Sequence, residues 1–182
     1  MANDMVTPQD LEHLPGAPFT DDEVDAAVAA VRLAAGWHIA PELTETITLD
    51  VTAYDSWLRL PTLKLVSVDA VRDTDDDSVF DAAKYRVSHR LAQVRKRTGY
   101  WPHGYERIEV DITHGFDAAP LELLSVIAEA ASTARRDQSV TQEAMGPFSM
   151  SIGTGGASQL GNPIGTGAIL EKFRIRFMPG IA

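Results

Sequence analysis

The chain has 182 residues, no cysteine and a formal net charge of −10 at pH 7. An acidic chain argues against ordinary nucleic-acid binding, which depends on clustered Lys and Arg, and the lack of cysteine excludes disulfides and thiolate metal sites. No apolar run approaches about 18 residues and no signal-like segment begins the chain, so we expect a soluble, non-exported protein of one domain.

The N-terminal region predicts two helices. Residues 8–14 read as a short helix capped by Thr7, with Pro8 in its first turn. Residues 20–35 read as a longer helix, because Thr20 and Glu23 have the spacing of a capping box and alanine and valine follow at core-facing intervals. Gly36 ends this helix.

The middle of the chain, from about residue 43 to 113, changes to the period-two alternation of half-buried strands. Its last strand alternates Ile108, Val110 and Ile112 with polar residues, which leaves Glu109 and Asp111 on the solvent side. The sequence therefore predicts several antiparallel strands inserted between helices. The strand-like stretches are 47–51, 57–60, 63–71, 79–80, 85–94 and 108–113.

A turn and a second long helix follow the last strand. Gly115 permits a backbone conformation that other residues avoid, and Pro120 suits the first turn of a helix. We expect a helix over residues 120–136 that shows little polar surface and packs on the 20–35 helix. It is either a central core helix or a helix that also contacts a neighbouring subunit. Arg135 and Arg136 suit the negative end of its dipole.

Residues 139–182 contain eight glycines and three prolines, which interrupt regular structure up to about residue 168. Their apolar side chains are too few to offset the entropy lost on ordering 44 residues. The predicted fold class is α+β, a small helical bundle with an inserted antiparallel β region over residues 1–138. Residues 139–182 are predicted to be an extended C-terminal tail that is ordered on assembly.

Two motif-like patterns lack required residues. Ile152–Gly155 and Ile164–Gly167 repeat Ile-Gly-Thr-Gly, but neither has the third glycine of a dinucleotide loop, so we interpret them as flexible connections. Asp73, Asp75 and Asp77 have the spacing of calcium ligands but lack the later glycine and glutamate of a calcium loop. We interpret them as an acidic, solvated turn.

One cluster of basic residues stands out, with two aromatic residues beside it. A solvated hairpin end is the simplest interpretation, and a phosphate contact or an acidic partner surface are the alternatives. The cluster consists of Arg90, Arg95, Lys96, Arg97 and Arg107, next to Tyr100 and Trp101.

The five histidines have no metal-ligand spacing, and no Gly-x-Ser-x-Gly elbow occurs, so we predict no enzyme activity, metal or cofactor. The alternative is an enzyme or small-ligand domain with a site around the Gly115 turn. That site would consist of Tyr100, Trp101, His103, His114 and Asp117.

The order and spacing of these pieces carry a resemblance. The pieces are an alanine-rich helix (21–35), a Leu-Pro followed by a valine-rich strand (58–68), a strand that begins at Tyr85 (85–94), a strand that ends in a glycine turn (108–116), and a proline with a long helix (119–136). Glu143–Ser149 and Leu170–Arg174 follow. This layout resembles the head-to-tail adaptor (head completion, or connector) proteins of tailed bacteriophages with long non-contractile tails. The chain departs from the family at Phe173-Arg174, where the family's closing helix often has Tyr-Arg, and 173–177 also alternate like a strand.

The resemblance implies a structural virion protein at the head-tail junction, made in the host cytoplasm. It implies a ring of about twelve copies between the portal protein and the next connector (stopper) protein, with DNA passing through during ejection. We expect acidic residues to line the channel, with Arg95, Lys96 and Arg97 away from the DNA. The alternative within the virion is a tail-completion or head-decoration protein. Expected subunit or portal contacts are Leu124, Ala128, Ala131, Phe148, Met150, Leu170, Phe173 and Phe177.

Overall fold

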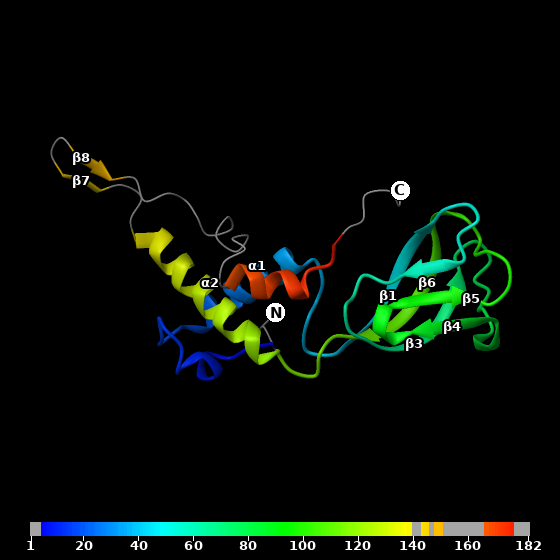
Figure 1. Cartoon of the computed structure of the whole chain (residues 1–182), viewed down its shortest axis with the longest axis horizontal. Helices are drawn as coiled ribbons and strands as arrows, with labels where there is room; N and C mark the ends of the chain where they lie inside the picture. The colour runs from blue at the N-terminus through cyan, green and yellow to red at the C-terminus, as the bar shows by residue number, and fades with distance from the viewer. Residues whose placement is uncertain (1–4, 140–142, 146–147, 151–165, 177–182) are drawn as a thin grey trace. The chain divides into compact units, whose positions relative to one another are not determined.

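The structure, a computed structural model, describes residues 5–139, 143–145, 148–150 and 166–176. The chain divides into two compact units (Figure 1). The helical unit comprises Met1–Gly36 and Ala118–Arg174, and the sheet unit comprises Trp37–Asp117 and Ile175–Ala182. Helices and two small antiparallel sheets confirm the predicted α+β class.

The helical unit begins with the 3₁₀ helix η1 (Pro8–Leu11) and the helix α1 (Asp21–Ala35). The predicted capping box of α1 is present, because the Thr20 side chain accepts a hydrogen bond from the Glu23 N–H and the Glu23 carboxylate accepts one from the Thr20 N–H. The prediction of a helix over 8–14 was too long. Pro15 disfavours the helical conformation of the residue before it, so only the first turn forms.

The second part of the helical unit contains α2 (Leu121–Ser139), the strands β7 (Glu143–Met145) and β8 (Phe148–Met150), the helix α4 (Thr166–Leu170) and the 3₁₀ helix η4 (Glu171–Phe173). Strands β7 and β8 form an antiparallel pair. Thr166 and Gly167, expected in a flexible connection, lie in the first turn of α4. Part of the predicted tail is therefore helical in the single chain. The first Ile-Gly-Thr-Gly copy lies outside the described residues.

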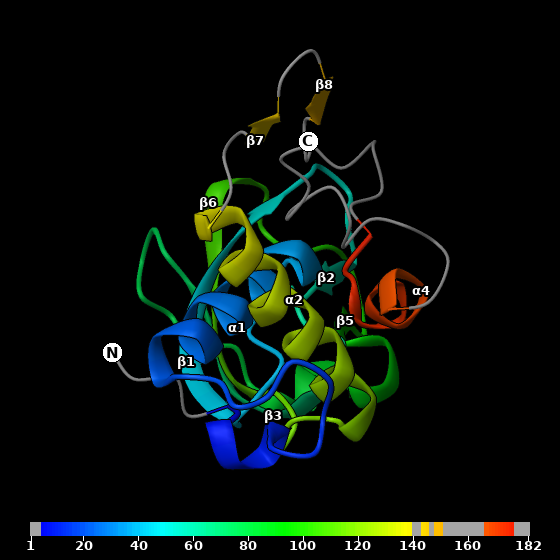
Figure 2. The same cartoon turned by 90° about the vertical axis from the view of Figure 1, so that its left-hand side faces the viewer.

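Helices α1 and α2 lie side by side, as the sequence predicted, and Figure 2 shows α4 beside α2. Helix α2 contacts η1, α1 and α4. Most of its apolar surface is therefore covered inside the helical unit. The buried side chains of the two long helices are Val24, Ala27, Val28, Val31 and Ala35 on α1, and Leu123, Val126, Ile127, Ala128 and Ala131 on α2.

The sheet unit contains two three-stranded antiparallel sheets with strand orders β1-β6-β3 and β2-β5-β4. The first sheet comprises β1 (Leu43–Val51), β6 (Gly104–His114) and β3 (Leu65–Asp73). The second comprises β2 (Trp57–Arg59), β5 (Gln93–Lys96) and β4 (Tyr85–Ser88). The short 3₁₀ helices η2 (Ala82–Lys84) and η3 (His89–Leu91) flank β4. The prediction of one strand-like stretch over 85–94 was wrong, because η3 and the left-handed Ala92 (φ 46°) separate β4 from its antiparallel partner β5.

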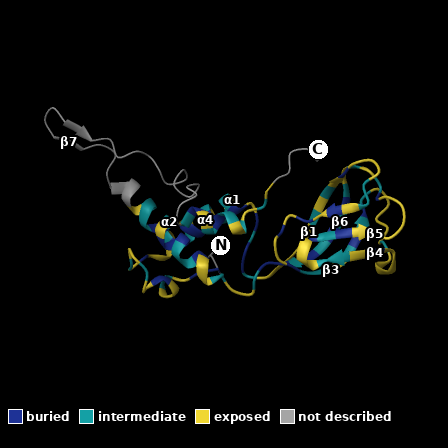
Figure 3. Cartoon of the chain, viewed as in Figure 1, coloured by how far each residue is buried: buried dark blue, intermediate teal, exposed yellow. Residues whose placement is uncertain are grey.

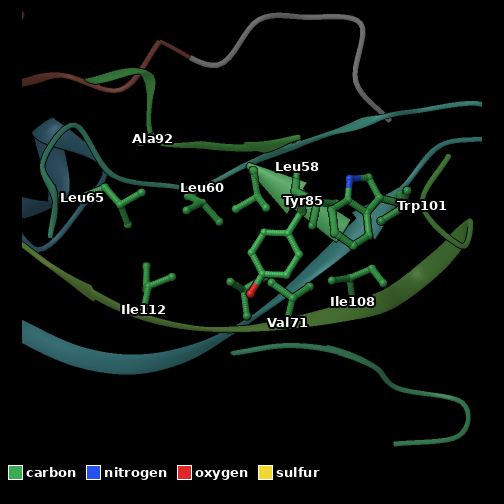
Figure 4. Close-up of a cluster of buried hydrophobic side chains, with 12 residues drawn as sticks. Leu58, Leu60, Leu65, Val71, Tyr85, Ala92, Trp101, Ile108 and Ile112 are labelled. Carbon is green, nitrogen blue, oxygen red and sulfur yellow. The ribbon is translucent and has the colours of Figure 1, made fainter. Parts of the chain in front are cut away.

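Both sheets supply side chains to one hydrophobic core (Figure 4). Trp101 is part of this core, although the sequence analysis placed it beside a solvated hairpin end. Its indole N–H donates a 3.1 Å hydrogen bond to the Ser56 carbonyl, and its ring meets that of Phe80 edge-on with centroids 5.1 Å apart. The core comprises Val51, Leu58, Leu60, Leu65, Val71, Tyr85, Ala92, Val94, Trp101, Ile108, Val110 and Ile112.

Strand β6 confirms the predicted alternation, because every second residue from Ile108 to His114 is buried. Irregularities in the pairing of β6 with β1 and β3 interrupt the ladders, and such bulges bend and twist strands. The loops that join the strands are largely exposed (Figure 3). The solvent-facing surface of this unit therefore consists of its loops and the outer faces of its two sheets.

The predicted special conformation of Gly115 is confirmed by a φ of 108°. The N–H of Gly115 donates to the Lys64 carbonyl at 2.9 Å, and the N–H of Phe116 donates to the Ile39 carbonyl at 2.7 Å. These bonds join the residues that follow β6 to the segment that precedes β1. The first and last residues of the sheet unit's main segment are thereby held together.

Candidate interaction surfaces

The predicted contact residues of the helical unit differ in exposure. Ala128, Ala131 and Leu170 are buried within the single chain, and Leu124 and Phe173 are half-buried. Phe148 and Met150 belong to β8, whose side chains are outside the described part, and Phe177 lies outside the described residues. Their role as subunit or portal contacts stays a prediction.

Exposed apolar side chains on both long helices were missed by the sequence reasoning. Leu33 on α1 is 85% exposed and Leu121 on α2 is 80% exposed. Ala26 and Ala29 are exposed as well and share a helical stripe with Leu33, because they precede it by seven and four residues. The spacing of three to four residues between Ala26, Ala29 and Leu33 is a sequence signal that could have distinguished this exposed stripe from the stripe of α1 that faces the core.

A surface cavity of about 430 Å³ lies beside α2 in the helical unit. The Thr166 hydroxyl at the start of α4 donates a hydrogen bond to the Glu129 carboxylate at its edge. A β-carbon on Gly16 would collide with the Ser132 hydroxyl oxygen, so the segment that contains Gly16 approaches α2 closely here. The lining residues are Pro15, Gly16, Ser125, Ala128, Glu129, Ser132, Thr133 and Thr166.

Arg135 joins α2 to the segment before α1. Its guanidinium donates two 2.7 Å hydrogen bonds to the Glu23 carboxylate and one of 2.8 Å to the Pro18 carbonyl, and it lies 5.4 Å from the Phe19 ring centroid. The Arg135 hydrogen bonds, followed by the Thr20 N–H, lower the pKa of Glu23 to about 2. The sequence assigned Arg135 to the helix dipole, whereas the structure shows a tertiary ion pair.

The acidic turn after β3 is not fully solvated, which corrects the sequence interpretation. Asp73 is only 6% exposed, and Arg107 forms ion pairs with both Asp73, at 2.9 Å, and Asp75. Burying a carboxylate without a cation is costly, so Arg107 has a structural task. It does not belong to the basic cluster in which the sequence placed it.

On the outer face of the β1-β6-β3 sheet, Arg72 and Asp111 form an ion pair within the chain. Asp111 on the central strand accepts hydrogen bonds from Arg72 at 3.0 Å and from the Thr46 hydroxyl at 2.7 Å. The Arg72 hydrogen bond, followed by that of Thr46, lowers the pKa of Asp111. Cross-strand pairs of this kind stabilise a sheet.

The outer face of the β2-β5-β4 sheet differs from the first. Arg95 on the central strand pairs with Trp57 on one side and with Arg86 on the other. Their neighbours Leu58 and Val94 are buried, so alternation turns Trp57, Arg95 and Arg86 outward. A row of one aromatic and two cationic side chains therefore crosses this sheet.

Four cationic side chains line a hollow of about 300 Å³ on this sheet, and we call them the basic face: Arg86, Arg95, Lys96 and Arg97. The Arg95 guanidinium stacks over the Trp57 ring, 4.7 Å from its centroid. Lys96 donates to the Tyr100 carbonyl at 2.8 Å, and Arg97 donates to the Tyr85 carbonyl at 3.3 Å. These contacts hold the cations in place without neutralising them.

The alternative enzyme site is not assembled. His114 is 1% exposed, and its Nε2 lies 2.8 Å from the Glu45 carboxylate. The residues proposed for this site lie at opposite ends of β6, which is 11 residues long and therefore spans about 30 Å. Tyr100, Trp101 and His103 precede its first residue, whereas His114 and Asp117 lie at its last residue and beyond.

Within the described part of the chain, no group of three or more potential metal-ligating side chains comes together. None of the helices described there combines the length and the apolar composition needed to cross a membrane.

No protein-family model and no curated protein matches the chain. Three solved structures match it over nearly its whole length. A chain of the neck of a native gene transfer agent (GTA) particle, computed with C12 symmetry, is 20% identical with a TM-score of 0.56, covering 99% of this chain and 98% of that chain. A chain of the neck of an empty GTA particle, computed with C6 symmetry, is 18% identical with a TM-score of 0.56 and the same coverage.

The third match is a chain of the virion of a native GTA particle, 19% identical with a TM-score of 0.56, covering 94% of this chain and 90% of that chain. At these identities the likeness concerns the fold. This protein shares the fold of chains from GTA neck and virion structures, with both of its units included in the match.

Proposed function

We propose that the protein is a structural component of a phage-like particle that joins the head to the tail. Copies of it form a ring of about twelve between the portal protein and the next connector, and DNA passes through the ring. The fold shared with GTA neck chains over 99% of this chain carries the proposal. C12 and C6 symmetry of those necks supports a ring.

The surfaces of the described residues suit this role. Leu33 and Leu121 are large apolar side chains exposed on the two long helices, where a neighbouring protein can cover them. The formal net charge of −10 per copy suits a channel that repels DNA and lets it slide, provided that acidic residues line it. In this arrangement Arg95, Lys96 and Arg97 lie away from the DNA path.

The experiment is deletion of the gene in the producing strain, followed by electron microscopy and quantitative mass spectrometry of the particles. We expect heads and tails that remain unjoined, and about twelve copies per wild-type particle. Joined particles without the protein would contradict the proposal. A copy number in the hundreds would identify a head-decoration protein instead, and location at the far end of the neck would identify a tail-completion protein.

A further inference from the structure

None of the four side chains of the basic face forms an ion pair with a described residue. Neither Arg86 nor Arg95 forms an ion pair with any described residue, whereas Arg72, Arg107 and Arg135 all do. Arg86 and Arg95 lie directly opposite each other on neighbouring strands. Like charges at such positions destabilise a sheet, so an anion between them would be stabilising.

The hollow shows what kind of anion fits. Lys96 and Arg97 add two further cations around about 300 Å³, which is room for a small number of carboxylate or phosphate groups. Trp57 lies beside them, with the Arg95 guanidinium over its ring. Stacked arginine and tryptophan are typical centres of protein interfaces.

The extent of the basic face argues against DNA as its ligand. Duplex DNA carries one charge per about 1.7 Å and is bound along extended tracks of Lys and Arg. Here the cations are confined to one hollow, and acidic residues adjoin it in the chain. The Asp55 carboxylate accepts a hydrogen bond from the N–H of Trp57, and burial, followed by the nearby charge of Asp81, raises the pKa of Tyr85, next to Arg86. A compact cluster of this kind fits a few carboxylates on a protein.

We propose that the basic face binds surface carboxylates of a second copy of this chain. The inference rests on the proposed function for the ring, in which each interface joins two different surfaces of identical subunits. Copies with a net charge of −10 repel each other, and a localised basic surface offsets that repulsion where they meet.

The chain carries exposed carboxylates suited to this contact. In the turn after β3, Arg107 pairs with Asp73 and Asp75, whereas Asp76 and Asp77 are exposed. In the helical unit, the first turn of α1 begins with two exposed aspartates, at positions 21 and 22. Either pair can meet the basic face of the next copy.

Site-specific photo-crosslinking tests the contact directly, because the chain has no cysteine of its own. Ser88→Cys places a benzophenone maleimide on β4, two residues from Arg86 and on the same side of the strand. We expect covalent products at multiples of the 19.8 kDa chain mass, both in concentrated solution and in purified particles. Mass spectrometry is expected to place the attachment near exposed aspartates. Crosslinks only to DNA or to another protein would overturn the inference.

Charge reversal tests the energetic contribution of the face. Arg86→Glu with Arg95→Glu is expected to weaken self-association in sedimentation velocity at low ionic strength by about tenfold or more. Lys84→Glu with Arg90→Glu is the matched control, because it changes the net charge equally at exposed cations outside the hollow. Equal effects of the two double variants would count against a specific contact.

Salt and DNA complete the experiment. Self-association of the wild-type chain is expected to fall as ionic strength rises, since salt screens exposed charges.

A fluorescein-labelled DNA duplex is expected to show no binding in anisotropy measurements, and binding that the Arg86/Arg95 variant abolishes would reassign the face to nucleic acid. A chain that stays monomeric at every ionic strength and forms no crosslinked pair also overturns the inference. The presence of the protein in particles is measured separately, so the proposed function can stand when the inference fails.

Discussion

Replacing Gly115 by alanine tests how the sheet unit is closed after β6. The residue has a φ of 108°, and an added β-carbon would lie 2.8 Å from the Pro41 carbonyl oxygen and 3.2 Å from that of Ile39. Both neighbours are backbone atoms and cannot rotate away. A left-handed conformation costs a non-glycine residue about 1–2 kcal/mol, and the forced backbone shift adds about 1–3 kcal/mol. We expect Gly115→Ala to lower the free energy of unfolding by about 2–5 kcal/mol.

Gly99→Ala is the matched control. Gly99 also has a positive φ, 73°, but a β-carbon there would meet no atom within 4 Å. Only the conformational cost applies, and the reduced entropy of the unfolded chain offsets part of it, so we expect a loss of about 1 kcal/mol.

Urea unfolding followed by tryptophan fluorescence measures both variants. The three tryptophans, at positions 37, 57 and 101, all lie in the sheet unit, so the signal reports the unit that is changed. Equal losses for Gly115→Ala and Gly99→Ala would refute the reasoning, because the steric contact with the segment before β1 would then contribute nothing.

Three further substitutions test other contacts. Ile127→Ala removes a fully buried side chain of α2 and is expected to lower the free energy of unfolding by about 2–5 kcal/mol in circular-dichroism melts. The matched variant Leu121→Ala changes an exposed side chain and is expected to cost less than about 0.5 kcal/mol. Arg135 lowers the pKa of Glu23 from 4.5 to about 2, so the stability that the ionised Glu23 contributes is complete above pH 4.5 and is lost as pH falls toward 2. Glu23→Gln should therefore reduce the dependence of the unfolding free energy on pH over that interval, and stability–pH curves that run parallel for variant and wild type would exclude the ion pair. Trp101→Phe removes the indole hydrogen bond to the part-buried Ser56 carbonyl, which keeps the Lys96 N–H as a donor, so the lost hydrogen bond should cost about 0.5–1.5 kcal/mol in urea unfolding.

Local signals located α1, β6 and the Gly115 turn correctly, whereas the break within the 85–94 stretch and the helix α4 were not predicted. The capping box at Thr20 and Glu23 and the terminal Gly36 located α1. Alternation along β6 identified its buried residues, because both patterns depend on neighbours within a few positions. The Gly115 turn was predicted for the same reason.

The candidate surfaces could not be predicted, because they depend on the pairing of strands, which a single sequence does not show. Trp57, Arg86 and Arg95 form one row only because β5 pairs with both β2 and β4 in a particular register. The sequence grouped Arg107 with the basic cluster by nearness in the chain, whereas strand β6 carries it to the acidic turn. Residue order alone therefore gave the cations but not their partners.

Leu43, the first residue of β1, pairs with His114, the last residue of β6, so the two ends of the sheet unit's main segment lie next to each other. This segment, Trp37–Asp117, is inserted between α1 and α2, and the hydrogen bond from Phe116 to Ile39 sets its incoming and outgoing strands next to each other. An insert whose two ends adjoin can be shortened, grafted or exchanged for another without pulling its host helices apart. The length and surface chemistry of this segment can thus change without a change in the packing of α1 on α2.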